Sequence, residues 1–228
     1  GEGNEINGLT LGGVGSGTTI DNIEVVANVD DGIEFFGGNV DASNLFVWAV
    51  GDDAIDIDQA YSGTITNVVV VQGDISDHAF EIDGPEGSLQ GAFLLQDATL
   101  FGLDSNQADG EVADCRSNAQ GTTRNVLVSG FTGIGEGLQL SDVELDNDGV
   151  ANNYTDGLLV FEAWEVVLPS GVNTSAQIFD DRSDVGSTFE ADAATFSSAV
   201  DNIGAATVGA DTSAFSWTYS NAKAGLGF

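Results

Sequence analysis

The stretch Asp31-Gly32-Ile33-Glu34-Phe35 decides the fold, because two later stretches repeat its pattern. They are Asp53-Ala54-Ile55-Asp56-Ile57 and His78-Ala79-Phe80-Glu81-Ile82. Each copy places one acid between two apolar residues, which is the period-two pattern of a strand with one buried face. The copies begin 22 and 25 residues apart, and this spacing is too short for a strand-helix-strand unit of about 30 residues. We therefore predict a solenoid whose repeated strands turn their acids toward solvent.

A second repeat interleaves with the first and places an asparagine before each of several apolar strands. The asparagines are Asn22, Asn44, Asn67 and Asn125. In a parallel β-helix, equivalent residues of successive coils stack at about 4.8 Å, so side-chain amides can hydrogen-bond along the stack. We predict that these four residues form such an asparagine ladder.

The charge balance limits the partners that the protein can bind. Four basic residues stand against 37 acidic ones in 228 residues, which gives a net charge of -33 at pH 7. Such a surface repels nucleic acid and anionic membranes, and no apolar run approaches the roughly 20 residues of a membrane-spanning helix. Screening salt or bound divalent cations would relieve the repulsion within the chain. We therefore expect a secreted protein, extracellular or on the cell surface, in a cation-rich milieu.

Two phrases of the sequence resemble a known family. They are NEINGLTLGGVGSGTTID at residues 4–21 and DDGIEFFGG at residues 30–38. The chain resembles the right-handed parallel β-helix proteins of the pectate-lyase-like superfamily. More narrowly, it is similar to uncharacterised secreted or lipoprotein β-helices of marine bacteria. The likeness covers roughly residues 4 to 165, and the repeated coils support it independently.

The resemblance and the repeats together predict an all-β fold, a right-handed single-stranded parallel β-helix with coils of about 22–25 residues. We expect the β-helix over residues 1–168 and a C-terminal coil and cap segment over 169–228, within the same domain. In that segment, residues 190–205 have the pattern of an amphipathic helix, and Phe215, Trp217 and Tyr219 alternate like a strand. The first coil lacks a comparable cap, so we expect either that the chain is a piece of something longer or that another subunit covers this end.

The repeated acids are the first candidate metal site. Stacking of the copies would place Glu34, Asp56 and Glu81 in one column, with Asp31 and Asp53 in the preceding turns. Two unit charges 4 Å apart repel by about 4 kcal/mol at an effective dielectric of 20. Bound Ca²⁺ would relieve this repulsion through hard oxygen ligands, and raised pKa values would do the same. The alternative is a solvated acidic face without specific sites.

A second candidate calcium site follows later in the chain. Its oxygen-bearing side chains are Glu144, Asp146, Asp148, Asn152 and Asp156. The alternating oxygens ahead of Gly149 resemble part of a D-x-D-x-D-G calcium loop. The match is partial, because the first position is Glu and the twelfth is Thr155 rather than a bidentate Glu. An ordinary turn rich in Asp, Asn and Gly is the alternative.

The resemblance also implies an enzymatic alternative. Polygalacturonases of this fold carry Asn-x-Asp, Gly-Asp-Asp and Gly-His-Gly motifs on successive coils, followed by Arg-x-Lys. Asp30, Asp52, Asp53 and His78 lie in counterparts of the first three motifs, in the same order, and paired carboxylates suit an inverting hydrolase. The Arg-x-Lys motif is missing from the sequence, and a strongly acidic chain repels a polyuronate substrate. His78 is also simply the third-copy counterpart of Asp53.

These observations favour a secreted acidic β-helix that acts as a structural, adhesive or filament-forming component. Ca²⁺ is the expected cofactor, and the chain itself is the expected partner, end to end or side by side. The alternatives are a polysaccharide hydrolase or lyase and a carbohydrate-binding module without turnover. For the module, Phe36, Phe46 and Trp48 are the candidate stacking rings, although packing beneath a loop is the commoner fate of such rings. Cys115 lies in a loop-like run, and we expect it to be a bystander.

Overall fold

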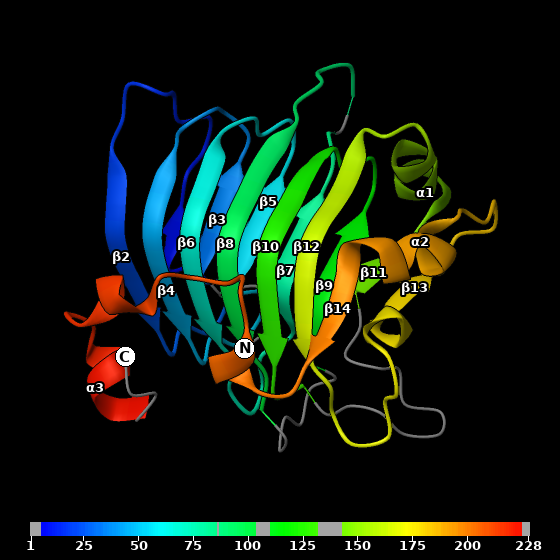
Figure 1. Cartoon of the computed structure of the whole chain (residues 1–228). Coiled ribbons are helices and arrows are strands. Elements are labelled where there is room, and N and C mark those ends of the chain that lie inside the picture. The colour runs from blue at the N-terminus through cyan, green and yellow to red at the C-terminus, as the bar shows by residue number, and fades with distance from the viewer. Residues whose placement is uncertain (1–5, 86, 104–109, 132–142, 225–228) are drawn as a thin grey trace.

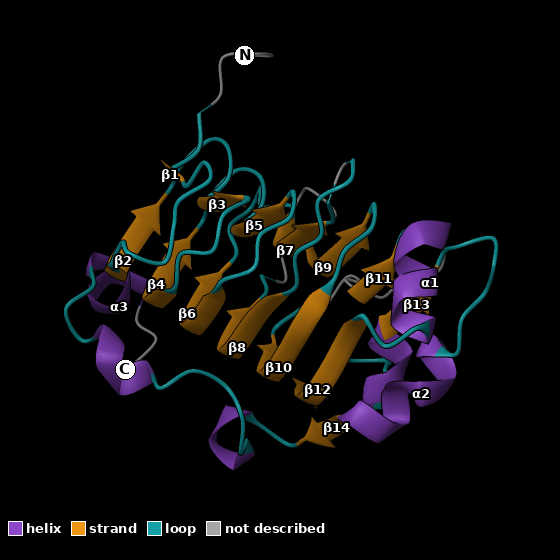
Figure 2. Cartoon of the chain, turned by 90° about the horizontal axis from the view of Figure 1, so that it is seen from above, coloured by secondary structure: helices purple, strands orange, loops and turns teal. Residues whose placement is uncertain are grey.

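The chain builds two parallel sheets and passes from one to the other along the sequence (Figure 1, Figure 2). The computed structural model describes residues 6–85, 87–103, 110–131 and 143–224. Sheet A contains, in spatial order, β1 (Leu9–Thr10), β3 (Ile33–Phe36), β5 (Ile55–Asp58), β7 (His78–Asp83), β9 (Glu111–Arg116), β11 (Val143–Leu145) and β13 (Phe179–Asp181). Sheet B contains β2 (Ile20–Val26), β4 (Ala42–Trp48), β6 (Thr64–Val71), β8 (Phe93–Phe101), β10 (Gly121–Ser129), β12 (Leu159–Val167) and β14 (Ser197–Val200). The predicted mainly-β architecture of stacked parallel coils is thereby confirmed.

The core lies between the two sheets and consists of the alternating apolar residues of the repeats. Ile33 pairs with Ile55, and Ile55 pairs with Phe80, in parallel register, and all three side chains are fully buried. Gly32 lies where adjacent coils approach closely, because a Cβ atom there would stand 2.5 Å from the carbonyl oxygen of Ala54. The first copy of the repeat therefore needs a glycine at this position.

The asparagine ladder lies on sheet B, and its residues bend the strands. Asn22, Asn44, Asn67 and Asn125 all have left-handed backbone conformations, with φ between 54° and 61°, which Asn tolerates better than most residues. Asn67 Nδ2 donates to Asn44 Oδ1 at 2.6 Å. Asp97, also left-handed, fills the missing position and accepts from Asn125 Nδ2 at 2.8 Å. The sequence reading placed the asparagines correctly and missed the aspartate between them.

The first member of the predicted ladder is bonded differently from the others. Asn22 Nδ2 donates to Asp21 Oδ2 at 2.6 Å, and Asn44 Nδ2 donates to Asp21 Oδ1 at 2.8 Å. The expected amide-to-amide bond between Asn22 and Asn44 is thus replaced by a bridge through a carboxylate. The physical reason is that an ionised carboxylate is a stronger acceptor than an amide oxygen.

Two helices cover the C-terminal end of the coils, α1 (Asp148–Thr155) and α2 (Phe189–Phe196) (Figure 2). The Asn147 side chain caps α1 by accepting from the backbone N–H groups of the first turn, as N-cap residues do. Phe189 of α2 lies 5.0 Å from the ring of Phe161 and 5.6 Å from that of Phe179. The aromatic contacts keep the open end of the core from solvent. Within the described ranges, no helix has the length and apolarity needed to cross a membrane.

The last part of the chain returns along the outside of sheet B, from β14 to β2 (Figure 1). We call residues 201–220 the C-terminal strap. The strap contains the short helices η2 (Ile203–Ala205) and η3 (Thr212–Phe215) and the start of α3 (Tyr219–Ala224). Outside the strap, the short helix η1 (Ser175–Ile178) precedes β13. Phe215 is fully buried and meets the ring of Phe46 edge to face, with centroids 5.5 Å apart. The strap therefore covers an apolar stripe on the outer face of sheet B.

Hydrogen bonds anchor the strap to several separate coils. Glu165 of β12 accepts from the backbone N–H of Thr207 at 2.7 Å, and Thr99 of β8 accepts from the N–H of Ala210 at 2.9 Å. Glu24 of β2 accepts from the backbone N–H of Ser220 at 2.7 Å. The strap thus ties coils from both ends of the solenoid to one another.

Two predictions for the C-terminal segment are wrong. The helix predicted over 190–205 ends at Phe196, after which the chain continues as β14. The strand predicted from Phe215, Trp217 and Tyr219 is replaced by η3 and α3. In both places the contacts with sheet B decide the conformation, because local propensity is a weak determinant next to tertiary packing.

Candidate functional site

The candidate site is a continuous row of acids on the outer face of sheet A. Parallel pairing brings one residue of each strand of sheet A into a single column. The column reads Thr10, Glu34, Asp56, Glu81, Asp114, Glu144 and Asp180. The predicted stacking of Glu34, Asp56 and Glu81 is confirmed, and the column continues for three further coils. We call this column, together with the acids of the preceding turns, the acidic face.

The acids do not all face solvent, which corrects the sequence reading. Asp56 is only 7% exposed and Asp53 only 3%. Neighbouring coils lie about 4.8 Å apart, so each outward side chain is enclosed by those above and below it. Within the described part of the chain, Asp56 Oδ1 is buried and has no hydrogen-bond partner. Such an unsatisfied polar atom is uncommon in a native protein.

Arginine side chains neutralise the later part of the column. Arg116 Nη2 lies 2.6 Å from Glu81 Oε1 and also pairs with Asp114. Arg182 pairs with Glu144, and its Nε donates to Asp180 Oδ2 at 3.1 Å. Arg116 comes two residues after Asp114 on β9, and Arg182 comes two residues after Asp180, directly beyond the end of β13. Residues two apart along a strand lie on the same face. The acidic face therefore contains its own counter-charges from β7 onward.

The earlier part of the column has no such counter-charge among the described residues. Glu34 Oε2 accepts a neutral hydrogen bond from Asn7 Nδ2 at 2.7 Å. Burial, followed by the charge of Glu81, raises the pKa of Asp56 to about 9. Burial, followed by the charge of Asp53, raises the pKa of Asp31 to about 7. Both carboxyls are therefore costly to ionise in this environment at neutral pH.

His78 occupies the place of Asp53 one coil later and forms a buried pair with it. The Nδ1 atom of His78 lies 2.7 Å from Asp53 Oδ1, and its backbone N–H donates to the same oxygen at 2.9 Å. Its Nε2 atom lies 3.6 Å from Glu111 Oε2 and 3.8 Å from Asp77 Oδ1. Burial alone would lower the pKa of His78, but the hydrogen bond and charge of Asp53 raise it to about 9. The ring is therefore an imidazolium at neutral pH and acts as a local cation.

Three groups of ligating side chains are compact enough to hold one ion, in the part of the chain that the structure describes. They are Asp30 with Asp31 and Asp52, Asp52 with Asp53 and Asp77, and Asp53 with His78 and Glu81. In each group the ligand atoms lie within 4.8 Å of one another. This is closer than the roughly 6.5–9.5 Å between the carboxyls of inverting glycosidases. The close-set carboxylate oxygens of the first two groups suit a hard divalent cation such as Ca²⁺, whereas the protonated ring of His78 in the third group is not a metal ligand.

The pKa values of two further carboxyls belong to the same arrangement. Burial, followed by the charge of Asp53, raises the pKa of Glu81 to about 8. Burial, again followed by Asp53, raises the pKa of Asp52 to about 6. Asp53 contributes to both shifts, so it lies at the electrostatic centre of the cluster. The structure thus unites two sets that the sequence kept apart, the metal candidates of the column and the catalytic candidates Asp30, Asp52, Asp53 and His78.

The second calcium candidate is spread over three kinds of structure. Glu144 lies on β11, buried and paired with Arg182. Asp146 follows that strand, and Asp148 opens α1 and accepts from the backbone N–H groups of Asp184 and Val185 at 2.9 and 3.1 Å. Asn152 lies within α1, and Asp156 caps its C-terminus. The predicted loop is thus the end of a strand followed by a capped helix, and calcium binding by these residues stays a prediction.

Several other candidate residues have structural positions. Cys115 lies on β9 and is fully buried, which corrects the prediction of a loop. Phe46 lies beneath the strap, so it offers no surface to a sugar, whereas Phe36 is 44% exposed. Arg116 and Glu111 are members of the acidic face that the sequence reading missed. The signal for Arg116 was its position two residues after Asp114, on the same face of one strand.

Comparison with known proteins gives one match. A family model described as a pectate-lyase-like β-helix domain matches residues 1–220. Neither the curated proteins nor the solved structures include a match to this chain. The matched range contains both sheets, the acidic face and the C-terminal strap.

Proposed function

The chain belongs to the pectate-lyase-like β-helix family, and on this premise we propose that it is a non-catalytic, cation-stabilised structural or adhesive component outside the cell. The family includes polysaccharide lyases and hydrolases as well as non-catalytic members, so membership alone leaves both functions open. We also propose the right-handed winding of the coils, since parallel crossover connections are right-handed in about 98% of cases.

The observation that carries the proposal is Asp56 Oδ1, which has no partner among the described residues and lies in the part of the column that no described arginine contacts. Where Arg116 and Arg182 occur, guanidinium groups bind the stacked carboxylates. A divalent cation bound beside Asp56 would supply the missing positive charge, with Asp31, Asp53 and Glu81 as the neighbouring carboxylates. Its charge would return the pKa values of these groups toward the ordinary range of carboxylates.

Calcium titration of the chelator-treated protein tests this proposal. At a Ca²⁺ concentration about 100 times the dissociation constant, we expect the free energy of unfolding to rise by about 2.7 kcal/mol. The substitution Asp56→Asn should remove most of that rise. The matched control is Asp180→Asn, in the same column but paired with Arg182, and it should retain the rise. Equal stabilisation of both variants by Ca²⁺, or no saturable binding at millimolar Ca²⁺, would refute the site.

The extracellular and self-assembling parts of the proposal rest on charge and on the solenoid architecture. A net charge of -33 keeps molecules apart by repulsion until cations screen or bridge them. We therefore expect sedimentation velocity to show larger species of the wild-type protein in millimolar Ca²⁺ than in chelator. A monomer with the same sedimentation coefficient under both conditions would count against assembly. It would not count against the calcium site, which the calcium titration tests independently.

A polysaccharide hydrolase or lyase is the second candidate function, and one specific observation favours it. Carboxyls with pKa values of about 9 at Asp56 and about 8 at Glu81 would be protonated at neutral pH, as a general acid must be. Incubation with acidic and neutral polysaccharides, followed by assays for reducing ends and unsaturated products, decides between the candidates. Activity that is lost on Asp53→Asn would replace the non-catalytic proposal. Saturable glycan binding that survives this substitution would indicate a carbohydrate-binding module.

A further inference from the structure

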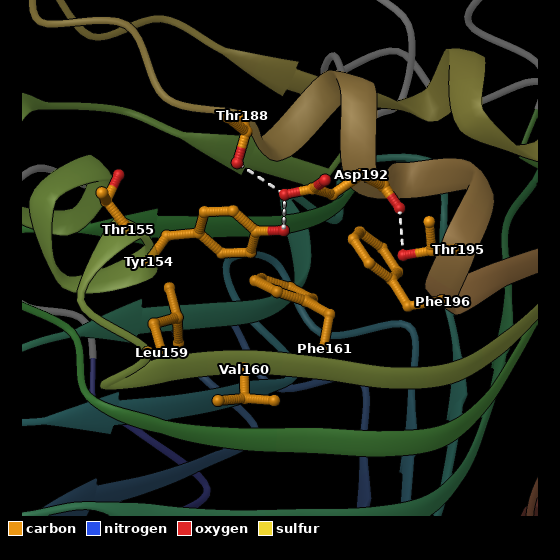
Figure 3. Close-up of a pocket in the computed structure, with 10 residues that line it drawn as sticks. Tyr154, Thr155, Leu159, Val160, Phe161, Thr188, Asp192, Thr195 and Phe196 are labelled. Atoms are coloured by element: carbon orange, nitrogen blue, oxygen red, sulfur yellow. Dashed lines mark hydrogen bonds between the residues drawn. The ribbon is translucent and has the colours of Figure 1, made fainter.

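A separate cavity lies at the C-terminal end of the solenoid, between α1, the start of β12 and α2 (Figure 3). Its volume is about 350 Å³, which is in the range of small-molecule sites. Figure 3 shows Tyr154, Phe161, Thr188, Asp192 and Phe196 around it. None of these residues belongs to the acidic face, so the cavity is independent of the calcium proposal.

The four hydroxyl groups that line the cavity all donate their protons within the protein. Tyr154 and Thr188 donate to Asp192 Oδ2, at 3.1 and 2.5 Å. Thr195 donates to the backbone oxygen of Asp192 at 2.7 Å, and Thr155 donates to that of Ala151 at 3.0 Å. Burial, followed by the charge of Asp192, raises the pKa of Tyr154 to about 12, so its phenol keeps its proton. These hydroxyl oxygens can therefore face a ligand only as acceptors.

The remaining lining groups have the same polarity. Asp192 contributes a half-buried carboxylate, and no described lining residue is basic. The rings of Phe161, Phe196 and Tyr154 supply aromatic surface, with Phe161 and Phe196 stacked at 5.7 Å. Aromatic faces carry a negative quadrupole and attract cations. Carboxylate, hydroxyl lone pairs and aromatic faces together make a site that accepts hydrogen bonds and positive charge.

We propose that this cavity binds the primary ammonium group of a small organic amine. A primary ammonium has three N–H donors and no acceptor, which matches lining side chains that offer acceptors only. A neutral sugar needs donors from the protein as well as acceptors, and the lining hydroxyls have none to spare. A quaternary ammonium would use the rings but leave the oxygen acceptors unused.

Calorimetric titration of the full chain with 1,5-diaminopentane tests the proposal, at an ionic strength that screens the general negative charge. We expect one saturable site, and we expect Asp192→Asn to weaken binding about tenfold or more, since hydrogen bonds to charged groups are the strong ones. Asn can still accept from Tyr154 and Thr188, so this variant should keep the local structure. The matched control is Asp201→Asn, an exposed acid in the strap whose loss changes the net charge equally and should leave the affinity unchanged.

A second variant and two comparison ligands complete the test. Phe196→Leu keeps an apolar side chain but removes a ring, so it should weaken binding severalfold while the thermal unfolding of the free protein confirms that it folds. The neutral analogue 1,5-pentanediol should bind at least tenfold more weakly than the diamine. Equal affinities of wild type and Asp192→Asn, or equal affinities for diol and diamine, would overturn the proposal. Binding of Ca²⁺ in competition with the diamine would overturn it too, since the site would then be a metal site.

Discussion

Replacing Asp56 with Asn should flatten the dependence of stability on pH. The pKa of this carboxyl is about 9 in the folded protein against 3.8 for the unperturbed group. Between these values the folded state holds a proton that the unfolded chain has released, so the free energy of unfolding falls as pH rises. The contribution of a carboxyl whose folded pKa is raised is thus fully present below pH 4 and lost by pH 9.

The size of this change in the free energy of unfolding follows from the single proton that Asp56 holds in the folded state. One proton held only by the folded state changes stability by about 1.4 kcal/mol for each pH unit. For metal-free wild type, this group alone should therefore cost roughly 3 kcal/mol between pH 5 and pH 7. Asn at position 56 does not titrate, so the variant lacks this contribution. Between pH 5 and pH 7, the free energy of unfolding of the variant should therefore rise by roughly 3 kcal/mol relative to that of the wild type.

Urea denaturation at constant ionic strength, in chelator and at a series of pH values, measures this difference. The exposed control Asp201→Asn should follow the wild-type curve. Parallel curves for wild type and Asp56→Asn would refute the reasoning, because they would show that no proton is linked to folding at this carboxyl. The raised pKa of His78, about 9, acts in the same direction and remains in the variant. The variant should therefore still lose some stability above pH 6.5 as this imidazolium deprotonates.

Three further predictions concern the strap, the ladder and the buried thiol. Phe215→Ala should lower the free energy of unfolding by roughly 3–5 kcal/mol. The control Trp217→Ala, at a side chain that is 46% exposed, should lower it by under about 1 kcal/mol. Similar losses for the two variants in denaturant titrations would mean that the strap does not pack as described. Asn67→Ala should lower the free energy of unfolding by about 2 kcal/mol, through strain of the left-handed backbone and loss of the hydrogen bond to Asn44. Asn67→Gly should lose only roughly half as much, because glycine adopts this conformation without strain. Equal unfolding midpoints for the Ala and Gly variants would contradict a strained backbone at position 67. Cys115, fully buried with its pKa raised by burial, should react with iodoacetamide only after unfolding, and rapid alkylation of the native protein would contradict its position in the core.

The periodic features of this protein were predictable because they are local and repeated. The alternation of Ile33, Glu34 and Phe35 identifies a strand with an inner and an outer face, and its recurrence gives the spacing of the coils. The asparagines at left-handed positions recur for the same reason, since every coil must make the same bend. Stacking follows once the period is known, so the column of acids could be predicted without coordinates.

The burial of the acids and their counter-charges were decided by tertiary contacts. Whether the Asp56 side chain is exposed to solvent or buried depends on the coils on either side. The alternation of apolar and acidic residues within one strand is the same in both cases. The pairing of Arg182 with Glu144 joins residues 38 positions apart in the sequence, which no short motif encodes. Val68, Val69 and Val70 of β6 are buried on both faces of the strand, but an apolar run by itself does not identify the segment that covers it.

The sequence by itself determined the parallel solenoid, the ladder and the column of acids, because each arises from interactions between equivalent residues one coil apart. Only the tertiary structure decided that arginines neutralise the later part of that column and that Asp56 Oδ1 has no partner among the described residues. It likewise decided that residues 201–220 cross sheet B and that Asp192 accepts hydrogen bonds from hydroxyl groups that line a cavity. These arrangements depend on which surfaces meet after folding, and such contacts lie beyond the reach of a repeating pattern.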